Sequence, residues 1–259
     1  MVTRAELEEY IARSISTLQE RPEGEPSRRY LRERGYLDLE VLRRFEVGFV
    51  PPDAAYPSAN PLRDKCEDHR RWQMRGRVVV PIRDPWGKLL GWTGRQVAEC
   101  RDTVAQRLSD CSPSTRVLRA MESWDAAKWF HESFRIGTAL FPLHLVHEGV
   151  AAHNEAWLVE GAMDAIACNL WGEGRDRTLS LGGTNLSGVQ ILLLRALCTN
   201  VVVYFDGDDA GKEGAERVGE QLKKAGFTVS TRATSPGLDP EDEVREKARG
   251  VSKRPGSQN

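Results

Sequence analysis

The chain has 259 residues, a formal net charge of −1 and five cysteines. Its near-neutral balance excludes a global basic field that would attract a polyanion, so any surface for nucleic acid has to be a local patch. No apolar run reaches the roughly 18 residues that a membrane span needs, and the first residues are charged. We therefore expect a cytoplasmic protein with no membrane partner.

The N-terminal segment, residues 1–24, predicts a helix followed by a linker. Apolar side chains recur at helical spacing between residues 3 and 20, namely at Leu7, Ile11, Ile15 and Leu18. The stretch 21–27 contains two prolines and a glycine, which end the helix.

Residues 25–150 predict a basic region that mixes helices with a hairpin. Its two strands are expected at 77–83 and 89–97, and the Asp-Pro-Trp-Gly sequence between them favours a type I turn. From Arg70 to Arg101 the sequence has eight basic residues against two acidic ones, which makes a local cationic patch. A helix pair is expected before the hairpin, with apolar positions at 30–31 and 39–45, followed by a short strand at 47–50 and a polar loop at 53–69. After the hairpin we expect a loop with a helical turn at 99–115 and one or two helices within 124–145.

Residues 151–250 alternate strictly between strand and helix patterns, which predicts βαβ units and a parallel sheet. We expect a disordered tail at 251–259. The strands are expected at 156–159, 178–181, 200–205 and 228–233, and the helices at 163–170, 189–197 and 210–225.

Acidic residues follow three of these four strands. Glu160 ends the first strand, Asp206 and Asp208 follow the third, and Asp239 and Glu241 follow the fourth. The carboxyl ends of parallel strands meet at one edge of the sheet, where ligands gather. Carboxylates brought together there repel one another, and a hard divalent cation such as Mg²⁺ or Mn²⁺ stabilises such a group.

Some acidic residues have simpler explanations. Asp209 and Asp242 are expected to be helix caps, whereas Asp164, one turn into a helix after Glu160, is expected to point back to the same edge. The cysteines never form a Cys-x-x-Cys pair, so we expect neither a disulfide framework nor a structural zinc.

Five ordered motifs resemble the catalytic core of DnaG-type DNA primases, with its TOPRIM domain. The resemblance covers roughly residues 28–245. The motifs are Tyr30–Phe49 (YLRERGYLDLEVLRRFEVGF), Gly76–Arg95 (GRVVVPIRDPWGKLLGWTGR), Trp157–Ala167 (WLVEGAMDAIA) with Leu179–Thr184 (LSLGGT), Val202–Ala215 (VVYFDGDDAGKEGA) and Gly237–Glu241 (GLDPE).

This resemblance implies an α/β fold in which a parallel-sheet TOPRIM domain at 151–250 follows an α+β primase subdomain at 25–150. It also implies metal-dependent synthesis of short RNA primers on single-stranded DNA from NTPs. The implied catalytic residues are Glu160, Asp206 and Asp208. Two metal ions would be held by these three residues, with support from Asp164, Asp239 and Glu241.

The same resemblance assigns basic residues of the chain to the template and nucleotide groove. The expected contacts are Arg34, Arg77, Arg83, Arg95, Arg116 and Lys212. Trp86 and Trp92, on the hairpin, offer flat surfaces on which bases of single-stranded DNA can stack. Trp72, Trp124 and Trp129 are expected to be core or interface residues.

The sequence departs from the family pattern in three respects. Gly182-Gly183-Thr184 has one glycine more than the usual loop, no zinc-ligand set precedes Cys66, and nothing after residue 250 predicts a helicase-binding domain. We therefore expect a replicative helicase or a zinc-ribbon module, where used, to be a separate partner. The remaining alternatives are a TOPRIM-type nuclease and a non-catalytic module that binds single-stranded nucleic acid.

Overall fold

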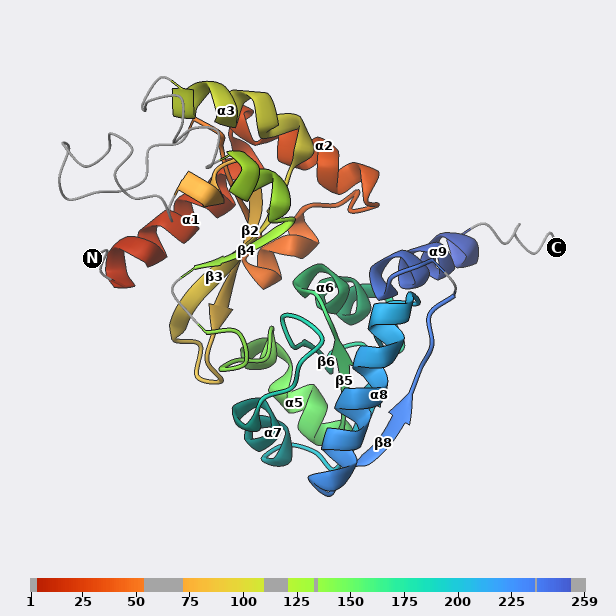
Figure 1. Ribbon diagram of the computed structural model, residues 1–259. Coiled ribbons are helices and arrows are strands. Elements are labelled where there is room, and N and C mark those ends of the chain that lie inside the picture. Colours follow the sequence, from red (N-terminus) through yellow and green to blue (C-terminus); the bar gives the residue numbers. More distant parts are fainter. Residues whose placement is uncertain (1–3, 54–71, 110–120, 133–134, 236, 253–259) are drawn as a thin grey trace. The chain divides into compact units, whose positions relative to one another are not determined.

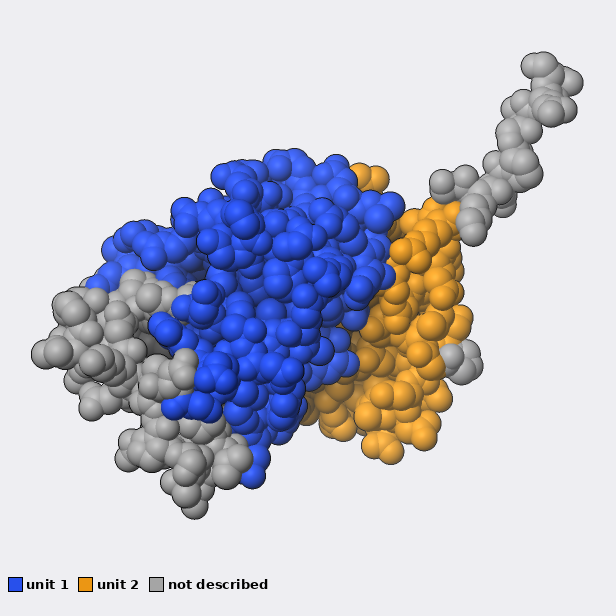
Figure 2. All heavy atoms as spheres, turned by 90° about the horizontal axis from the view of Figure 1, so that it is seen from above, with its two compact units in different colours: residues 1–82, 89–134 blue, residues 83–88, 135–259 orange. Residues whose placement is uncertain are grey.

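The computed structural model describes residues 4–53, 72–109, 121–132, 135–235 and 237–252 (Figure 1). The chain folds into two compact units (Figure 2). The first unit contains residues 1–82 and 89–134, and the second contains residues 83–88 and 135–259. Within the described ranges, no helix combines the length and the apolar character that a membrane crossing demands.

The first unit is an α+β structure with a four-stranded antiparallel sheet in the order β1-β2-β3-β4. Residues 121–126 are helical as well. The elements in chain order are α1 (Arg4–Glu20), η1 (Pro22–Gly24), α2 (Glu25–Glu33), η2 (Glu40–Phe45), β1 (Gly48–Val50), η3 (Trp72–Met74), β2 (Arg77–Arg83), β3 (Leu89–Gln96), η4 (Ala98–Cys100), α3 (Arg101–Ser109) and β4 (Trp129–Glu132).

The core of this unit forms where α1 packs on the sheet. Tyr10 of α1 meets Trp92 of β3 edge to face, with ring centroids 5.3 Å apart. Gly48 allows the close approach, because a Cβ atom there would collide with Ser14 of the helix. Trp92 is completely buried in this core, so the expectation that it offers a stacking surface for DNA is wrong.

The first unit has a strand where the sequence predicts helix. Residues 129–132 form β4, which pairs antiparallel with β3 through Arg95↔Trp129 and Thr93↔His131. The strand is short, and its hydrogen-bonding partner lies more than thirty residues earlier in the chain. Local periodicity therefore could not reveal it.

The second unit confirms the predicted parallel sheet, with strand order β6-β5-β7-β8. The register places Leu158 beside Leu179 on one side and beside Val203 on the other. The elements are α5 (Leu143–His153), β5 (Glu155–Val159), α6 (Ala162–Trp171), β6 (Thr178–Ser180), α7 (Gly188–Arg195), β7 (Asn200–Val203), α8 (Asp209–Lys224), β8 (Thr228–Thr231) and α9 (Pro240–Ser252).

The two faces of this sheet are covered by different helices. Side chains of α5, α7 and α8 share one buried core with Ala156 and Leu158 of β5. The helices α6 and α9 pack on each other, and α6 contacts β5 and β6 (Figure 1). The two central strands, β5 and β7, are therefore mostly apolar and buried, whereas the edge strand β8 is largely exposed.

Two features of the second unit differ from the sequence-based boundaries. The helix α5 packs on the parallel sheet, so the division between the units falls at residue 135 rather than at 151. The helix α9 was not predicted, and it continues to Ser252, past the start of the expected tail at 251. The polar loop expected at 53–69 and most of the expected tail lie outside the described residues, as do Cys66 and Cys111.

Candidate metal centre

Glu160 stands at the carboxyl end of β5 and is held there by the loop that follows β6. Its backbone carbonyl accepts hydrogen bonds from the N–H groups of Gly182 (3.1 Å) and Gly183 (3.0 Å) and from the hydroxyl of Ser180 (2.8 Å). Both glycines have positive φ, 76° and 150°, so the extra glycine of this loop shapes a turn around Glu160. Its carboxylate accepts the N–H of Asp206 at 3.2 Å.

The segment after β7 combines a close approach with a helix cap. A Cβ atom at Gly207 would lie 2.6 Å from the Thr234 hydroxyl, so only glycine fits there. Asp208 is the N-cap of α8 and accepts the N–H of Gly211 at 2.7 Å. The prediction that Asp209 caps this helix is therefore wrong, because Asp209 is its first helical residue and is exposed.

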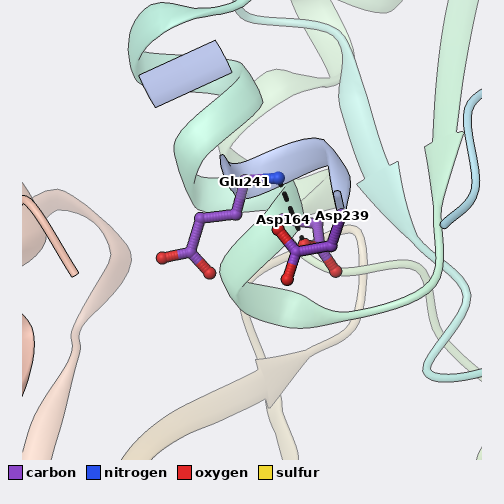
Figure 3. A group of neighbouring side chains, drawn as sticks. All are labelled: Asp164, Asp239 and Glu241. Atoms are coloured by element: carbon purple, nitrogen blue, oxygen red, sulfur yellow. Dashed lines mark hydrogen bonds between the residues drawn. The ribbon is translucent and has the colours of Figure 1, made fainter. Parts of the chain in front are cut away.

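A second acidic group forms where α6 meets the start of α9 (Figure 3). Asp164, Asp239 and Glu241 each offer a carboxylate oxygen, and these oxygens all lie within 4.8 Å of one another. Asp164 turns back on its own helix to accept the N–H of Gly161 at 3.0 Å, and it also accepts the N–H of Glu241 at 3.4 Å.

The start of α9 explains the Asp-Pro-Glu-Asp sequence. Asp239 accepts the N–H of Asp242 at 2.7 Å, in the manner of an N-cap, and Pro240 occupies the first helical position. Asp242 is therefore not the cap that the sequence predicted. Glu241 is completely buried and lies 3.7 Å from the guanidinium of Arg245, four residues on.

Burial and mutual repulsion perturb the acidic side chains of this region. The pKa of Asp164 is raised well above its ordinary value, first by burial and then by the carboxylates of Asp239, Glu241 and Asp206. The pKa of Glu160 is raised by burial, which the N–H of Asp206 opposes and the charge of Asp208 reinforces. Carboxylate oxygens that repel one another at a site partly shielded from solvent are suitable ligands for a hard divalent cation.

The structure places the predicted acidic residues at one edge of the parallel sheet. The residues that come close enough to share an ion are not the ones that were expected to be central. Among the described residues, the three carboxylates that lie close enough to share one ion are those of Asp164, Asp239 and Glu241, which the resemblance gave a supporting role. The Glu160 carboxylate accepts a hydrogen bond from the N–H of Asp206, and the negative charge of Asp208 repels it.

Sequence reasoning missed two residues that position these carboxylates, Ser180 and Arg245. The spacing of Glu241 and Arg245 on one helix signals their pairing, because residues four apart lie on the same helical face. Nothing local signals Ser180, whose partner Glu160 lies twenty residues earlier in the chain.

Arg77 does not have the role that the sequence predicted. It is completely buried, and it donates to the backbone carbonyls of Gln73 (2.6 Å), Lys128 (3.2 Å) and Gly94 (3.3 Å). Its guanidinium also stacks on Trp124, 5.3 Å from the ring centroid. Arg77 therefore ties the hairpin to the segment before β4 and has no exposed surface for a nucleic acid.

The other predicted basic contacts have mixed surroundings. Arg34 stacks on Tyr30 at 5.8 Å and Arg95 on Trp129 at 5.5 Å, and both are partly buried. Arg83 is also partly buried. Lys212 is exposed on α8 and lies 3.5 Å from Asp209. Arg116 lies outside the described residues.

Comparison with known proteins shows which family and which proteins this chain is similar to. Residues 157–244 match the Toprim-like family. A DNA primase of Geobacillus stearothermophilus is 31% identical over 238 residues, which cover 86% of this chain and 36% of that protein. The chain thus spans about a third of the length of this relative.

Solved structures extend the likeness to both units. A structure of the DnaG catalytic core is 25% identical, with a TM-score of 0.68, over 96% of this chain and 78% of that one. A DnaG primase catalytic domain bound to single-stranded DNA shares the fold at 24% identity, with a TM-score of 0.68, over 96% and 76% of the two chains. By sequence and by fold, the chain is similar to the catalytic cores of DnaG-type DNA primases.

Proposed function

We propose that the chain synthesises short RNA primers on a single-stranded DNA template from NTPs. The observation that carries this proposal is the gathering of strand-end carboxylates at one edge of the parallel sheet, where burial first and mutual repulsion second raise the pKa values of Glu160 and Asp164. A nucleotidyl transfer needs such a set, because the triphosphate and the attacking hydroxyl both develop negative charge that has to be neutralised.

The acidic residues fit Mg²⁺ or Mn²⁺, since all of them are oxygen donors. Two bound ions would activate the 3′-hydroxyl and neutralise the NTP phosphates. We assign Glu160, Asp206 and Asp208 to the centre, and Asp164, Asp239 and Glu241 to its support. Glu160 accepts the proton of the 3′-hydroxyl, because its raised pKa brings it closer to the working pH of a general base.

Substitutions that preserve the fold test the proposal. Single-stranded DNA, labelled NTPs and Mg²⁺ or Mn²⁺ are incubated with the wild type and with an Asp206→Asn/Asp208→Asn variant. Asparagine removes the charges but still caps a helix, so α8 stays intact. Asp209→Asn is the matched control, since Asp209 is exposed one residue further on.

We expect primer synthesis in the wild type and in Asp209→Asn, and its loss in the double variant. Shortening of the DNA without incorporation of NTPs would replace the polymerase by a nuclease. DNA binding with neither activity would leave only a passive binding module.

A further inference from the structure

The turn between β2 and β3 presents Trp86 to solvent. This side chain is 86% exposed, more than any other large apolar side chain among the described residues. The other large apolar side chains that are exposed there are aliphatic. They are Leu37, Ile136, Val189 and Leu192. An indole is the best of these side chains for stacking on a flat ring.

The backbone below Trp86 is held in place by the side chain of Asp84. One carboxylate oxygen of Asp84 accepts the N–H groups of Trp86 (3.0 Å) and Lys88 (2.9 Å). The turn is closed by a bond from the N–H of Gly87 to the carbonyl of Asp84 (2.9 Å), and Gly87 adopts a φ of 83°. The guanidinium of Arg83 donates to the Gly87 carbonyl at 3.0 Å.

Such a turn lowers the conformational-entropy cost of binding a ligand. The backbone of the turn is already ordered in the free protein, so only the indole side chain loses conformational freedom on binding. Lys88 is exposed beside it. The charge of Asp84 is engaged by two backbone donors, and Arg83 and Lys88 give the turn a net positive charge.

A single exposed apolar side chain is ordinary and by itself explains nothing. Here the exposed side chain is aromatic, its backbone is fixed and its neighbours are cationic. An aromatic surface for bases, flanked by positive charge for the backbone phosphates, is how proteins hold single-stranded nucleic acid without reading its sequence.

We propose that Trp86 is a stacking platform for an unpaired base of single-stranded DNA, and that Lys88 contacts an adjacent phosphate. This inference rests on the proposed function, and it identifies the turn between β2 and β3 as an element that binds the template. Stacking on Trp86 is indifferent to base identity, so it holds any template sequence.

Binding of a fluorescent oligothymidylate, measured by anisotropy, tests the inference. We expect Trp86→Ala to weaken binding about tenfold, or ~1.4 kcal/mol, and Trp86→Phe to retain most of the affinity. Leu37→Ala is the matched control, because Leu37 is 79% exposed and lies outside the hairpin. Lys88→Ala should reduce the dependence of log K on log salt by about one phosphate contact, whereas Trp86→Ala should leave that slope unchanged.

An abasic oligonucleotide separates stacking from charge. The wild type and Trp86→Ala should bind it equally, since it offers no base. Equal affinity of the two proteins for oligothymidylate would overturn the inference, as would a Trp86→Ala defect that persists on the abasic strand. A shift from dimer to monomer in Trp86→Ala, with DNA binding intact, would assign the indole to a protein interface. None of these results touches primer synthesis, which the aspartate variants test.

Discussion

Glu160 shows how much positioning a single residue receives from its surroundings. Its carbonyl is fixed by the loop after β6, and its carboxylate is fixed by the N–H of Asp206. The hydroxyl of Ser180 is central to the loop, because it donates to the Glu160 carbonyl and accepts the N–H of Gly182 at 3.0 Å. A small shift of this loop would move the carboxylate relative to the other acidic groups.

Ser180→Ala should therefore reduce the rate of primer synthesis by about tenfold while the KM for NTPs changes little. Ser180→Thr retains the hydroxyl and should restore most of the rate. Ser109→Ala is the matched control, since Ser109 is exposed on α3. Steady-state kinetics decide the matter, with thermal unfolding alongside. A variant that loses thermal stability but keeps the wild-type rate would show that Ser180 supports only the fold.

Asp164 makes the stability of the metal-free protein depend on pH. The pKa of its carboxyl is raised above the ordinary 3.8, so the native state keeps a proton that the unfolded state releases. By linkage, stability falls as pH rises from about 4 through the native pKa. The raised pKa of Glu160 acts in the same direction. A divalent cation offsets the repulsion and should stabilise more at higher pH.

Thermal unfolding in EDTA and in Mn²⁺, measured across this pH range, should show the two curves diverging as pH rises. Asp164→Asn should flatten the decline in EDTA and reduce the gain from Mn²⁺. A wild type whose Tm in EDTA declines with rising pH no more steeply than that of the variant would contradict the account.

At the scale of elements, sequence patterns predicted the strands and helices that nearby residues determine. The strands and helices of the parallel sheet follow from apolar runs separated by amphipathic segments, and the carboxylates follow from the strand ends. The strand β4 depends on a partner distant in sequence, so its short pattern carried no signal. The caps of α8 and α9 were each misplaced, because neighbouring aspartates compete for the position and only backbone geometry selects Asp208 and Asp239.

Arg77 illustrates how burial overrides a motif. A motif position indicates a basic residue but not the direction in which its side chain points. Burial, together with the nearby charge of Arg95, lowers the pKa of Arg77 to about 10. Its guanidinium donates to the backbone carbonyls of Gln73, Gly94 and Lys128 from this buried position.

Arg77→Met should destabilise the first unit by about 3 kcal/mol, because methionine fills part of the volume but removes the buried hydrogen bonds and the stacking on Trp124. Arg29→Met is the matched control. Arg29 is exposed in a 3.4 Å pair with Glu99, so its loss should cost about 0.5 kcal/mol or less. Urea unfolding, followed by tryptophan fluorescence, measures both. Equal effects of the two substitutions would show that the buried contacts of Arg77 contribute little.

For the whole molecule, the division into two units separates the carboxylates from the antiparallel sheet. All six predicted acidic residues belong to the second unit, and the main core of that unit draws only on residues 140–227. The sequence indicated two parts through its change of pattern. It could not place the boundary, because α5 shows on which sheet it packs only in the folded structure.

A fragment of residues 135–259 should consequently fold alone and bind Mn²⁺ with a Kd within about threefold of that of the full chain. Its core and its carboxylates are its own, so the metal meets the same donors. Calorimetric titration and thermal unfolding of both proteins measure this, and Asp239→Asn/Glu241→Gln should weaken binding equally in each. Primer synthesis should be absent from the fragment, because the hairpin and its basic residues are missing. An unfolded fragment would mean that residues before 135 are needed for the fold, and a folded one that binds Mn²⁺ more than about tenfold more weakly would mean that they complete the metal centre.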